Sequence, residues 1–238
     1  MSPSGGEGPL SVSIILPVLD EAAGIGEALN ALQVERPRGA EIIVVDGGSS
    51  DATVALATPH ADRVLVATRG RASQMNVGAR AARSDVLLFL HADTRLPSEG
   101  VQLVREAIAQ GAAWGRFDVS IAGRHPMLPV IATMMNLRSR LTGIATGDQA
   151  IFVRRDIFLA VGGFAEIELM EDVALCAALR QIARPACLRE RVVTSGRRWD
   201  ANGAWSTILL MWRLRLLYAL GASPAWLAWQ YRASRAGQ

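Results

Sequence analysis

The chain has 238 residues, half of them hydrophobic, which is enough to form one large α/β domain around its own core. Its formal net charge is +3, and all 25 basic residues are arginine, so it has neither a P-loop lysine nor the amine of a Schiff-base enzyme. It shows no leader-type segment and no run of about 18 apolar residues, so we expect a cytoplasmic protein without a membrane span.

The first half of the sequence alternates short apolar runs with longer amphipathic segments. We predict strands at residues 12–16, 41–45, 63–67 and 86–90. We predict helices at residues 22–33, 73–82 and 99–110, and a shorter helix that ends at residue 57. Strands that alternate with helices of this length indicate βαβ units and a parallel sheet. Right-handed crossovers then bring the carboxyl ends of these strands to one edge of the sheet.

The second half is less regular. We predict a strand exposed on one face at residues 114–121, a strand at 149–153 and an edge strand at 187–194, with helices at 127–141, 157–161 and 171–182. The expected fold is therefore α/β: a Rossmann-like, mostly parallel sheet flanked by helices over residues 11–200. A flexible segment is expected at residues 1–10, and a helical extension at residues 201–238.

Acidic residues follow three of the predicted buried strands: Glu21, Asp46 and Asp93. In an open α/β sheet, ligands bind in the crevice beyond the carboxyl ends of the strands, so we expect these carboxylates to meet at one rim. Asp46 is followed by two glycines, which let a ligand approach the backbone closely, and its carboxylate can accept a hydrogen bond from a nucleobase or a ribose hydroxyl. For Asp51 we expect an Asx turn and a helix cap instead.

Two further positions predict metal and proton chemistry. Asp93 can hold Mg²⁺ or Mn²⁺ against a diphosphate, because hard divalent cations take oxygen ligands and let phosphate oxygens complete the shell. His91 is either a half-buried packing residue or a nitrogen ligand of that ion. Glu171 and Asp172 begin a predicted helix, where acids offset the macrodipole, but a carboxylate there can also act as general base on an acceptor hydroxyl. We expect the acceptor side to be lined by Gly147, Asp148 and Gln149.

Four segments resemble the motifs of the family 2 glycosyltransferases in order and approximate spacing: residues 17–21, 46–51, 91–94 and 171–172. The resemblance covers roughly residues 11–200 and is strongest for small bacterial members whose third motif reads His-Ala-Asp. It implies the GT-A fold and an inverting transfer of a sugar from a nucleotide-diphospho-sugar to an acceptor hydroxyl, with a divalent cation, Mg²⁺ or Mn²⁺, as cofactor. We expect a UDP-sugar as the donor.

The resemblance also implies roles for individual residues. The positions that resemble nucleoside-binding and nucleotide-lining residues of the family are Pro17, Glu21, Asp46, Arg71 and Asn76. Asp93 resembles the last carboxylate of the Asp-x-Asp metal motif, and Asp172 resembles the catalytic base of the Glu171-Asp172 pair. The chain departs from the family at Asp20, where an Asn is usual, and at His91, which replaces the first carboxylate of Asp-x-Asp and so removes one anionic metal ligand.

The end of the sequence differs in character from the rest. Residues 180–238 hold ten arginines against two acidic residues, and five of the six tryptophans, whereas residues 1–179 hold 15 arginines against 20 acidic residues. Tryptophan and arginine among apolar residues fit a peripheral contact with the inner face of the cell membrane and a lipid-linked acceptor. The alternative is a C-terminal helix that packs on the main domain. We do not expect nucleic-acid binding, because the basic segment is apolar rather than a polar strip.

Other functions fit this sequence less well than sugar transfer does. A non-catalytic module could bind nucleotide sugars on the same fold, but the intact Glu171-Asp172 pair favours an enzyme. A sugar nucleotidyltransferase is disfavoured, because Asp20 and Glu21 would repel a triphosphate after the first strand. Processive synthesis is not expected, because residues 196–199 match only the Arg-Trp of the Gln-x-x-Arg-Trp segment of the processive members.

Overall fold

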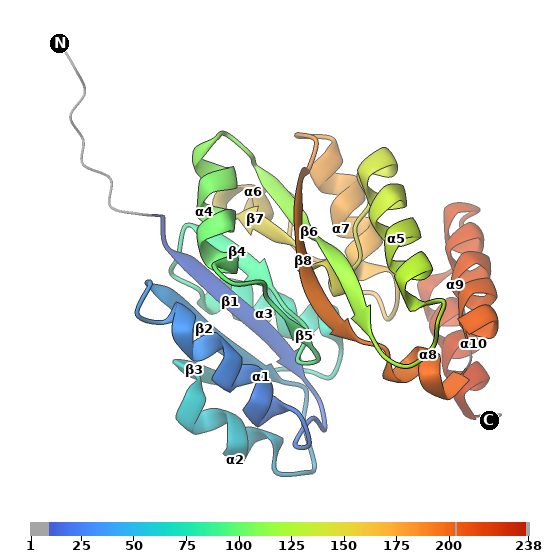
Figure 1. Ribbon diagram of the computed structural model, residues 1–238, viewed down its shortest axis with the longest axis horizontal. Coiled ribbons are helices and arrows are strands. Elements are labelled where there is room, and N and C mark those ends of the chain that lie inside the picture. Colours follow the sequence, from blue (N-terminus) through green and yellow to red (C-terminus); the bar gives the residue numbers. More distant parts are fainter. Residues whose placement is uncertain (1–9, 203, 237–238) are drawn as a thin grey trace.

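The computed structural model describes residues 10–202 and 204–236 and shows a mixed α/β fold, with helices on both faces of one sheet (Figure 1). Residues 1–9 of the expected flexible start lie outside the described residues. The strands are β1 (Val12–Val18), β2 (Ala40–Asp46), β3 (Arg63–Val66), β4 (Val86–Phe89), β5 (Thr94–Arg95), β6 (Trp114–Ala122), β7 (Phe152–Arg154) and β8 (Ala186–Ser195).

The α-helices are α1 (Ile25–Leu32), α2 (Thr53–Ala57), α3 (Arg71–Ala81), α4 (Gly100–Ala109), α5 (Leu128–Thr142), α6 (Arg155–Ala160), α7 (Glu171–Arg180), α8 (Arg197–Asn202), α9 (Ala204–Ala219) and α10 (Pro224–Ala236). Short 3₁₀ turns are η1 (Gln33–Glu35), η2 (Thr58–His60) and η3 (Gly147–Gln149). Every helix predicted in the first half is present, with ends that differ by a few residues.

In the described chain the sheet has eight strands in the order β3-β2-β1-β4-β7-β6-β8-β5. β1 pairs in parallel with both β2 and β4, so Val12 lies opposite Ala40 on one side and Val86 on the other. β3 is parallel to β2, and β8 is parallel to β6, whereas β7 and β5 run antiparallel to their neighbours. The predicted mostly parallel sheet is therefore confirmed.

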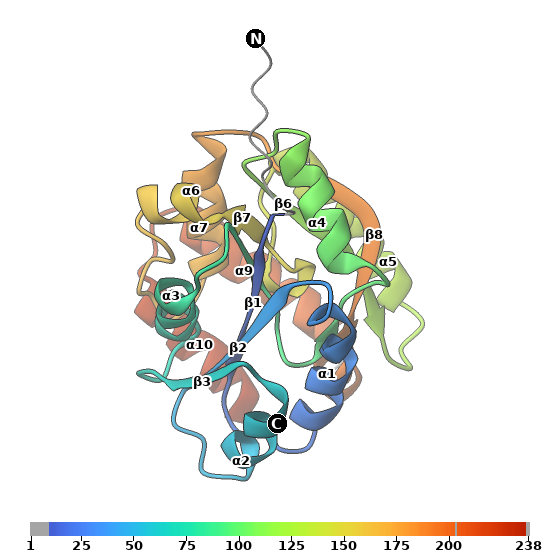
Figure 2. The same ribbon diagram turned by 90° about the vertical axis from the view of Figure 1, so that its left-hand side faces the viewer.

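Helices cover both faces of this sheet (Figure 2), and the hydrophobic core lies between the sheet and the helices on each face. Ile14 and Ile42 face the helices α1, α4 and α5, whereas the neighbouring residues Ile15 and Ile43 face α3, α6 and α7. Because both faces are buried, the strands read as continuous apolar runs rather than as alternating ones. This is the pattern that made them recognisable in the sequence.

The structure corrects the predictions for β6, β7 and β8. The strand predicted from residue 149 begins only at Phe152, because residues 147–149 form η3. β6 is not exposed on one face, because its polar residues Arg116 and Asp118 are buried. β8 is not a bare edge, because β5 pairs with its residues Val193 and Thr194.

The C-terminal helices pack on the rest of the protein. Leu214 of α9 and Leu227 of α10 form a buried cluster with Met170, which immediately precedes α7. The domain boundary that we expected at residue 200 falls inside α8. Among the described residues, no helix has the length and apolar character needed to cross a bilayer.

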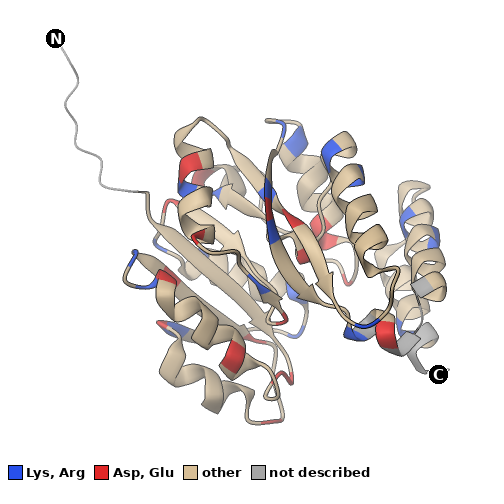
Figure 3. Cartoon of the chain, in the orientation of Figure 1, with Lys and Arg blue, Asp and Glu red and all other residues tan. Residues whose placement is uncertain are grey.

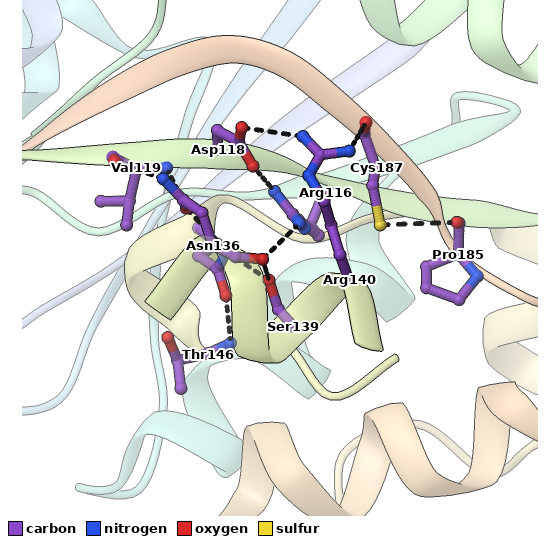
Figure 4. Close-up of polar contacts among 10 residues, drawn as sticks. Arg116, Asp118, Val119, Asn136, Ser139, Arg140, Thr146, Pro185 and Cys187 are labelled. Carbon is purple, nitrogen blue, oxygen red and sulfur yellow. Dashed lines mark hydrogen bonds and ion pairs between the residues drawn. The ribbon is translucent and has the colours of Figure 1, made fainter. Parts of the chain in front are cut away.

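A buried polar network ties α5 to β6 (Figure 4). Arg116 is 1% exposed and its guanidinium donates to Asp118, which also accepts from Arg140 Nη2 at 2.8 Å. Asn136 of α5 pairs with the backbone of Val119: its Nδ2 donates to the carbonyl oxygen at 2.9 Å, and its Oδ1 accepts from the amide at 2.8 Å. The helix is therefore fixed in register along the strand by polar groups.

We expect Asp118→Asn to lower the free energy of unfolding by about 3–5 kcal/mol, because it leaves the buried guanidinium of Arg116 without its counter-charge. The measurement is urea denaturation followed by circular dichroism. Asp156→Asn is the matched control: it breaks the exposed ion pair with Arg154, which is worth about 0–1 kcal/mol. A loss for Asp118→Asn no larger than that of the control would contradict this reading of the network.

Candidate functional site

The parallel register of β1, β2 and β4 brings three of the predicted motifs to one edge of the sheet. Val18 lies opposite Asp46, and β4 stops at Phe89, so residues 17–21, 46–51 and 91–94 leave the sheet side by side. Pro17 has no N–H to donate, and in this central strand its nitrogen faces the side of β4, as that of Ile15 does. Ile15 is the last residue of β1 that pairs with β4, so Pro17 lies beyond the end of β4 and the sheet loses no hydrogen bond there.

The loops after β1 and β2 are bonded to each other. Asp20 Oδ1 accepts from the amide of Ser50 at 2.8 Å, and the Asp20 amide donates to Ser49 Oγ at 2.9 Å. The amide of Glu21 donates to Thr53 Oγ1 at 2.8 Å. These reciprocal bonds hold the two predicted nucleoside-binding loops as one unit.

Asp46 is buried, and its carboxylate accepts from the amides of Gly48 at 2.8 Å and Ser49 at 3.0 Å. It therefore shapes the turn that follows β2. Gln74 of α3 supports this turn from below, because its Nε2 donates to the carbonyl oxygens of Val18 and Val45 at 2.7 and 2.8 Å. Sequence reasoning missed Gln74, since a single glutamine on an apolar helix face gives no signal of its own.

Glu21 and Asp93 share a cation. Arg197 Nη2 lies 3.9 Å from Glu21 Oε2 and 3.9 Å from Asp93 Oδ2. Partial burial raises the pKa of Glu21, the positive charge of Arg197 opposes that rise, and the charge of Asp93 adds to it. Arg197 was not among the predicted site residues, and the available signal was the Arg-Trp segment at residues 196–199.

His91 connects the metal motif to the acceptor side. Its Nδ1 lies 3.4 Å from Asp148 Oδ1, and its ring lies so close to Gly147 that any side chain at that position would collide with it. The amide of Gly147 donates to Asp172 Oδ2 at 3.0 Å. The structure thus gives His91 the half-buried position next to Asp148, and links it through Gly147 to the predicted base.

The two acids of the fourth motif have different surroundings. Glu171 is 5% exposed, and burial together with the neighbouring charge of Asp172 raises the pKa of its carboxyl, while Arg71 opposes the rise from 3.7 Å. Asp172 is more open and accepts from the amides of Gly147 and Val173. Arg71 begins α3, so its ion pair joins the starts of α3 and α7.

The structure buries the side chains of two predicted site residues. Gln149 is 0% exposed and its Nε2 donates to Ser139 Oγ at 3.0 Å, so it cannot line the acceptor side. Asn76 is buried, and both ends of its amide bond the backbone of Phe164, at 2.8 and 2.9 Å. Both side chains fasten a loop to a helix, because buried amides need partners within the protein.

The residues present fit a divalent cation that binds together with the phosphates of a substrate. Among residues 10–202 and 204–236, no cluster of three or more His, Cys, Asp or Glu could hold an ion alone. Asp93 offers one partly exposed carboxylate, and Mg²⁺ or Mn²⁺ needs few protein carboxylates where substrate phosphates complete the shell.

Comparison with known proteins identifies the family. The family model described as glycosyl transferase family 2 matches residues 13–162. An undecaprenyl-phosphate 4-deoxy-4-formamido-L-arabinose transferase of Pseudomonas aeruginosa is 31% identical over 111 residues, which is 42% of this chain and 33% of that protein. The match thus spans about a third of the length of such curated relatives.

Solved structures share the fold. A mannosyltransferase from Pyrobaculum calidifontis, in complex with GDP-Man and Mn²⁺, has a TM-score of 0.65 at 18% identity, over 97% of this chain and 75% of that one. TarS residues 1–349 from S. aureus has a TM-score of 0.64 at 21% identity, over 79% and 61%. Together with the family model, which covers more than half of the sequence, these likenesses confirm the resemblance: the chain belongs to glycosyl transferase family 2 and has the GT-A fold.

Proposed function

We propose that this protein is an inverting glycosyltransferase that moves a sugar from a nucleotide-diphospho-sugar to an acceptor hydroxyl, with Asp172 as general base and a divalent cation at Asp93. The observation that carries the proposal is a chain of contacts. Asp93 follows His91 by two residues, His91 lies against Gly147, and Gly147 binds the carboxylate of Asp172. A leaving group at Asp93 and an acceptor at Asp172 would therefore meet in one site.

The donor would lie across the bonded loops after β1 and β2. We propose that Pro17, Glu21 and the turn built on Asp46 contact the nucleoside, and that Arg71 lies beside the nucleotide. Related structures bear on the donor class: TarS has been solved with UDP-GlcNAc, and the Pyrobaculum mannosyltransferase with GDP-Man. We propose a UDP-sugar as the donor for this chain.

The diphosphate leaves with growing negative charge on its oxygens. A Mg²⁺ or Mn²⁺ ion held by Asp93 would supply Lewis-acid stabilisation of that charge. Arg197 supplies a second cation from the protein itself, because it lies 3.9 Å from the Asp93 carboxylate and is exposed enough to turn toward a phosphate. A guanidinium can bind phosphate oxygens with two parallel hydrogen bonds.

Asp172 would accept the proton of the acceptor hydroxyl. The acceptor oxygen forms its bond to the anomeric carbon as the bond from that carbon to the diphosphate oxygen breaks on the opposite face, and a single displacement inverts the centre. Asp172 suits this role better than Glu171, since Glu171 is buried with a raised pKa and paired with Arg71. The backbone amide of Gly147 fixes the direction of the Asp172 carboxylate.

We propose a lipid-linked acceptor, approached beside Gly147 and Asp148. Curated relatives are named as transferases that act on undecaprenyl phosphate, and the basic, Trp-rich C-terminal helices pack directly against the start of α7. A peripheral position at the inner face of the cell membrane follows from such an acceptor. The alternative remains a non-catalytic module that binds nucleotide sugars.

We expect Asp172→Asn to lower turnover by about 10²–10⁴-fold, the range for a positioned general base, and to leave donor affinity unchanged. Transfer of the sugar to lipid-linked acceptors that carry a free hydroxyl gives the rate, and calorimetry gives the affinity for the UDP-sugar. Asp156→Asn, on the surface, is the control. A near-normal rate would remove Asp172 from this role, and a wild-type protein that binds the donor but transfers to no acceptor would favour the non-catalytic module.

Two substitutions separate the metal from the protein cation. With Mn²⁺ present, Asp93→Ala should weaken UDP binding, and in chelator it should have no effect. Arg197→Gln should weaken UDP binding about tenfold in chelator as well, because a charge-assisted contact to phosphate is lost. Isothermal calorimetry measures both, with Arg154→Gln as an exposed arginine control. Equal weakening by Asp93→Ala in the two conditions would argue against a metal at this residue.

Glu171 should make stability depend on pH. Its folded-state pKa is raised above the ordinary value of 4.5, so the folded protein binds more protons than the unfolded chain in the window from 4.5 up to that raised pKa. Stability is therefore lost as pH rises through the window. Relative to Glu171→Gln, the wild type should lose stability as the pH rises above 4.5 through the raised pKa of Glu171, measured by urea denaturation. If the wild type instead gained stability relative to Glu171→Gln as the pH rises, the ion pair with Arg71 would affect the pKa of Glu171 more than burial does.

A further inference from the structure

Helix α9 has two apolar faces. Leu210, Leu214 and Leu217 pack in the cluster around Met170. On the opposite face, four large side chains spaced by four, three and four residues are between 61% and 65% exposed: Trp205, Leu209, Trp212 and Leu216. This spacing places them on one stripe, which is too large and too uniform to be scattered surface residues.

Arginines border this stripe. Arg213 and Arg215 stand on either side of the buried Leu214, and because each residue turns the helix by roughly 100°, they lie along the two edges between the packed and the exposed faces. The long side chain of an arginine can extend from such an edge and place its charge at a polar boundary while its stem stays on apolar surface.

Helix α5 carries a second exposed stripe with the same spacing. Its side chains are between 48% and 77% exposed: Val130, Met134, Leu137 and Leu141. Ile208 of α9 packs against the core cluster that contains Ile131 of α5. The sequence predicted a helix at residues 127–141, and the structure shows that α5 also carries apolar side chains that are exposed.

Both helices are basic. Neither α5 nor α9 contains an acidic residue, and each carries two arginines, a contrast that Figure 3 shows against the mixed charges of the rest of the fold. Arg140 of α5 is already paired with Asp118, but Arg213 and Arg215 border the stripe of α9, and a second copy that placed α9 against α9 would set these arginines against each other. An anionic lipid surface supplies both an apolar layer for the exposed stripes and phosphates for the arginines.

We propose that the exposed faces of α9 and α5 form a monotopic docking surface for an anionic lipid bilayer. The surface deepens the proposed function, and its purpose rests on the proposed lipid-linked acceptor. Leu214 and Leu227 hold Met170, directly before Glu171 and Asp172, and α5 ends a few residues before Gly147. Both segments of the acceptor side are thereby attached to elements that lie on the bilayer.

The test is flotation with vesicles of phosphatidylcholine, with and without about 30% phosphatidylglycerol. Wild type should float with the anionic vesicles, and less so at high salt. The double variants Trp212→Ser/Leu216→Ser on α9 and Leu137→Ser/Leu141→Ser on α5 should each lower the partition coefficient about tenfold or more, because exposed apolar area that would enter the lipid is removed. The matched control is Val66→Ser, an equally exposed apolar residue (72%) on β3.

Equal flotation of wild type and the double variants would overturn the proposal, as would equal flotation with neutral vesicles. If wild type sediments as a dimer and the same substitutions dissociate it, the surface is an interface with a second copy of the chain. Calorimetry measures the affinity of each variant for UDP-sugar, which we expect to be unchanged. This measurement distinguishes a failure of membrane docking from a failure of the proposed function. A wild-type protein that binds UDP-sugar but does not float with anionic vesicles counts against this surface alone, and docking without any transfer counts against the proposed enzyme alone.

Discussion

The pairing of β1 with β2 and β4 is the constraint on which the site depends. Parallel strands in register end at the same edge, so three loops far apart in the sequence leave the sheet side by side. Hydrogen bonds between Asp20 and Ser50 and between Glu21 and Thr53 then join two of the loops. A shift of one residue in this register would turn every side chain of the strand to the other face and would move Asp46 from its place opposite Val18.

Arginines at helix starts balance the acidic rim. Arg71 begins α3 and faces Glu171, and Arg197 begins α8 and lies between Glu21 and Asp93. Helix N-termini carry partial positive charge, so the rim has fixed dipoles and mobile cations around its carboxylates. In the proposed function, a diphosphate and its metal ion would replace the interactions that these arginines and carboxylates already make with each other.

The C-terminal helices α9 and α10 pack against the residue that precedes the Glu171-Asp172 pair. Met170 has a left-handed φ of 71°, a costly conformation for a residue other than glycine, and it is buried between Leu214 and Leu227. Packing by α9 and α10 therefore holds the strained residue that precedes Glu171 and Asp172. The alternatives of a packed helix and a membrane-facing helix are compatible, because the two roles use opposite faces of α9.

The sequence by itself determined the first four strands, their helices and the acids at the strand ends, because continuous apolar runs and adjacent turn residues are local signals. It did not determine that Gln149 and Asn76 are buried, that Arg116 and Asp118 pair beneath α5, or that Arg197 reaches the rim. Each of these depends on a partner distant in the chain, and only tertiary packing decides whether a polar side chain faces a ligand or satisfies the protein's own buried groups.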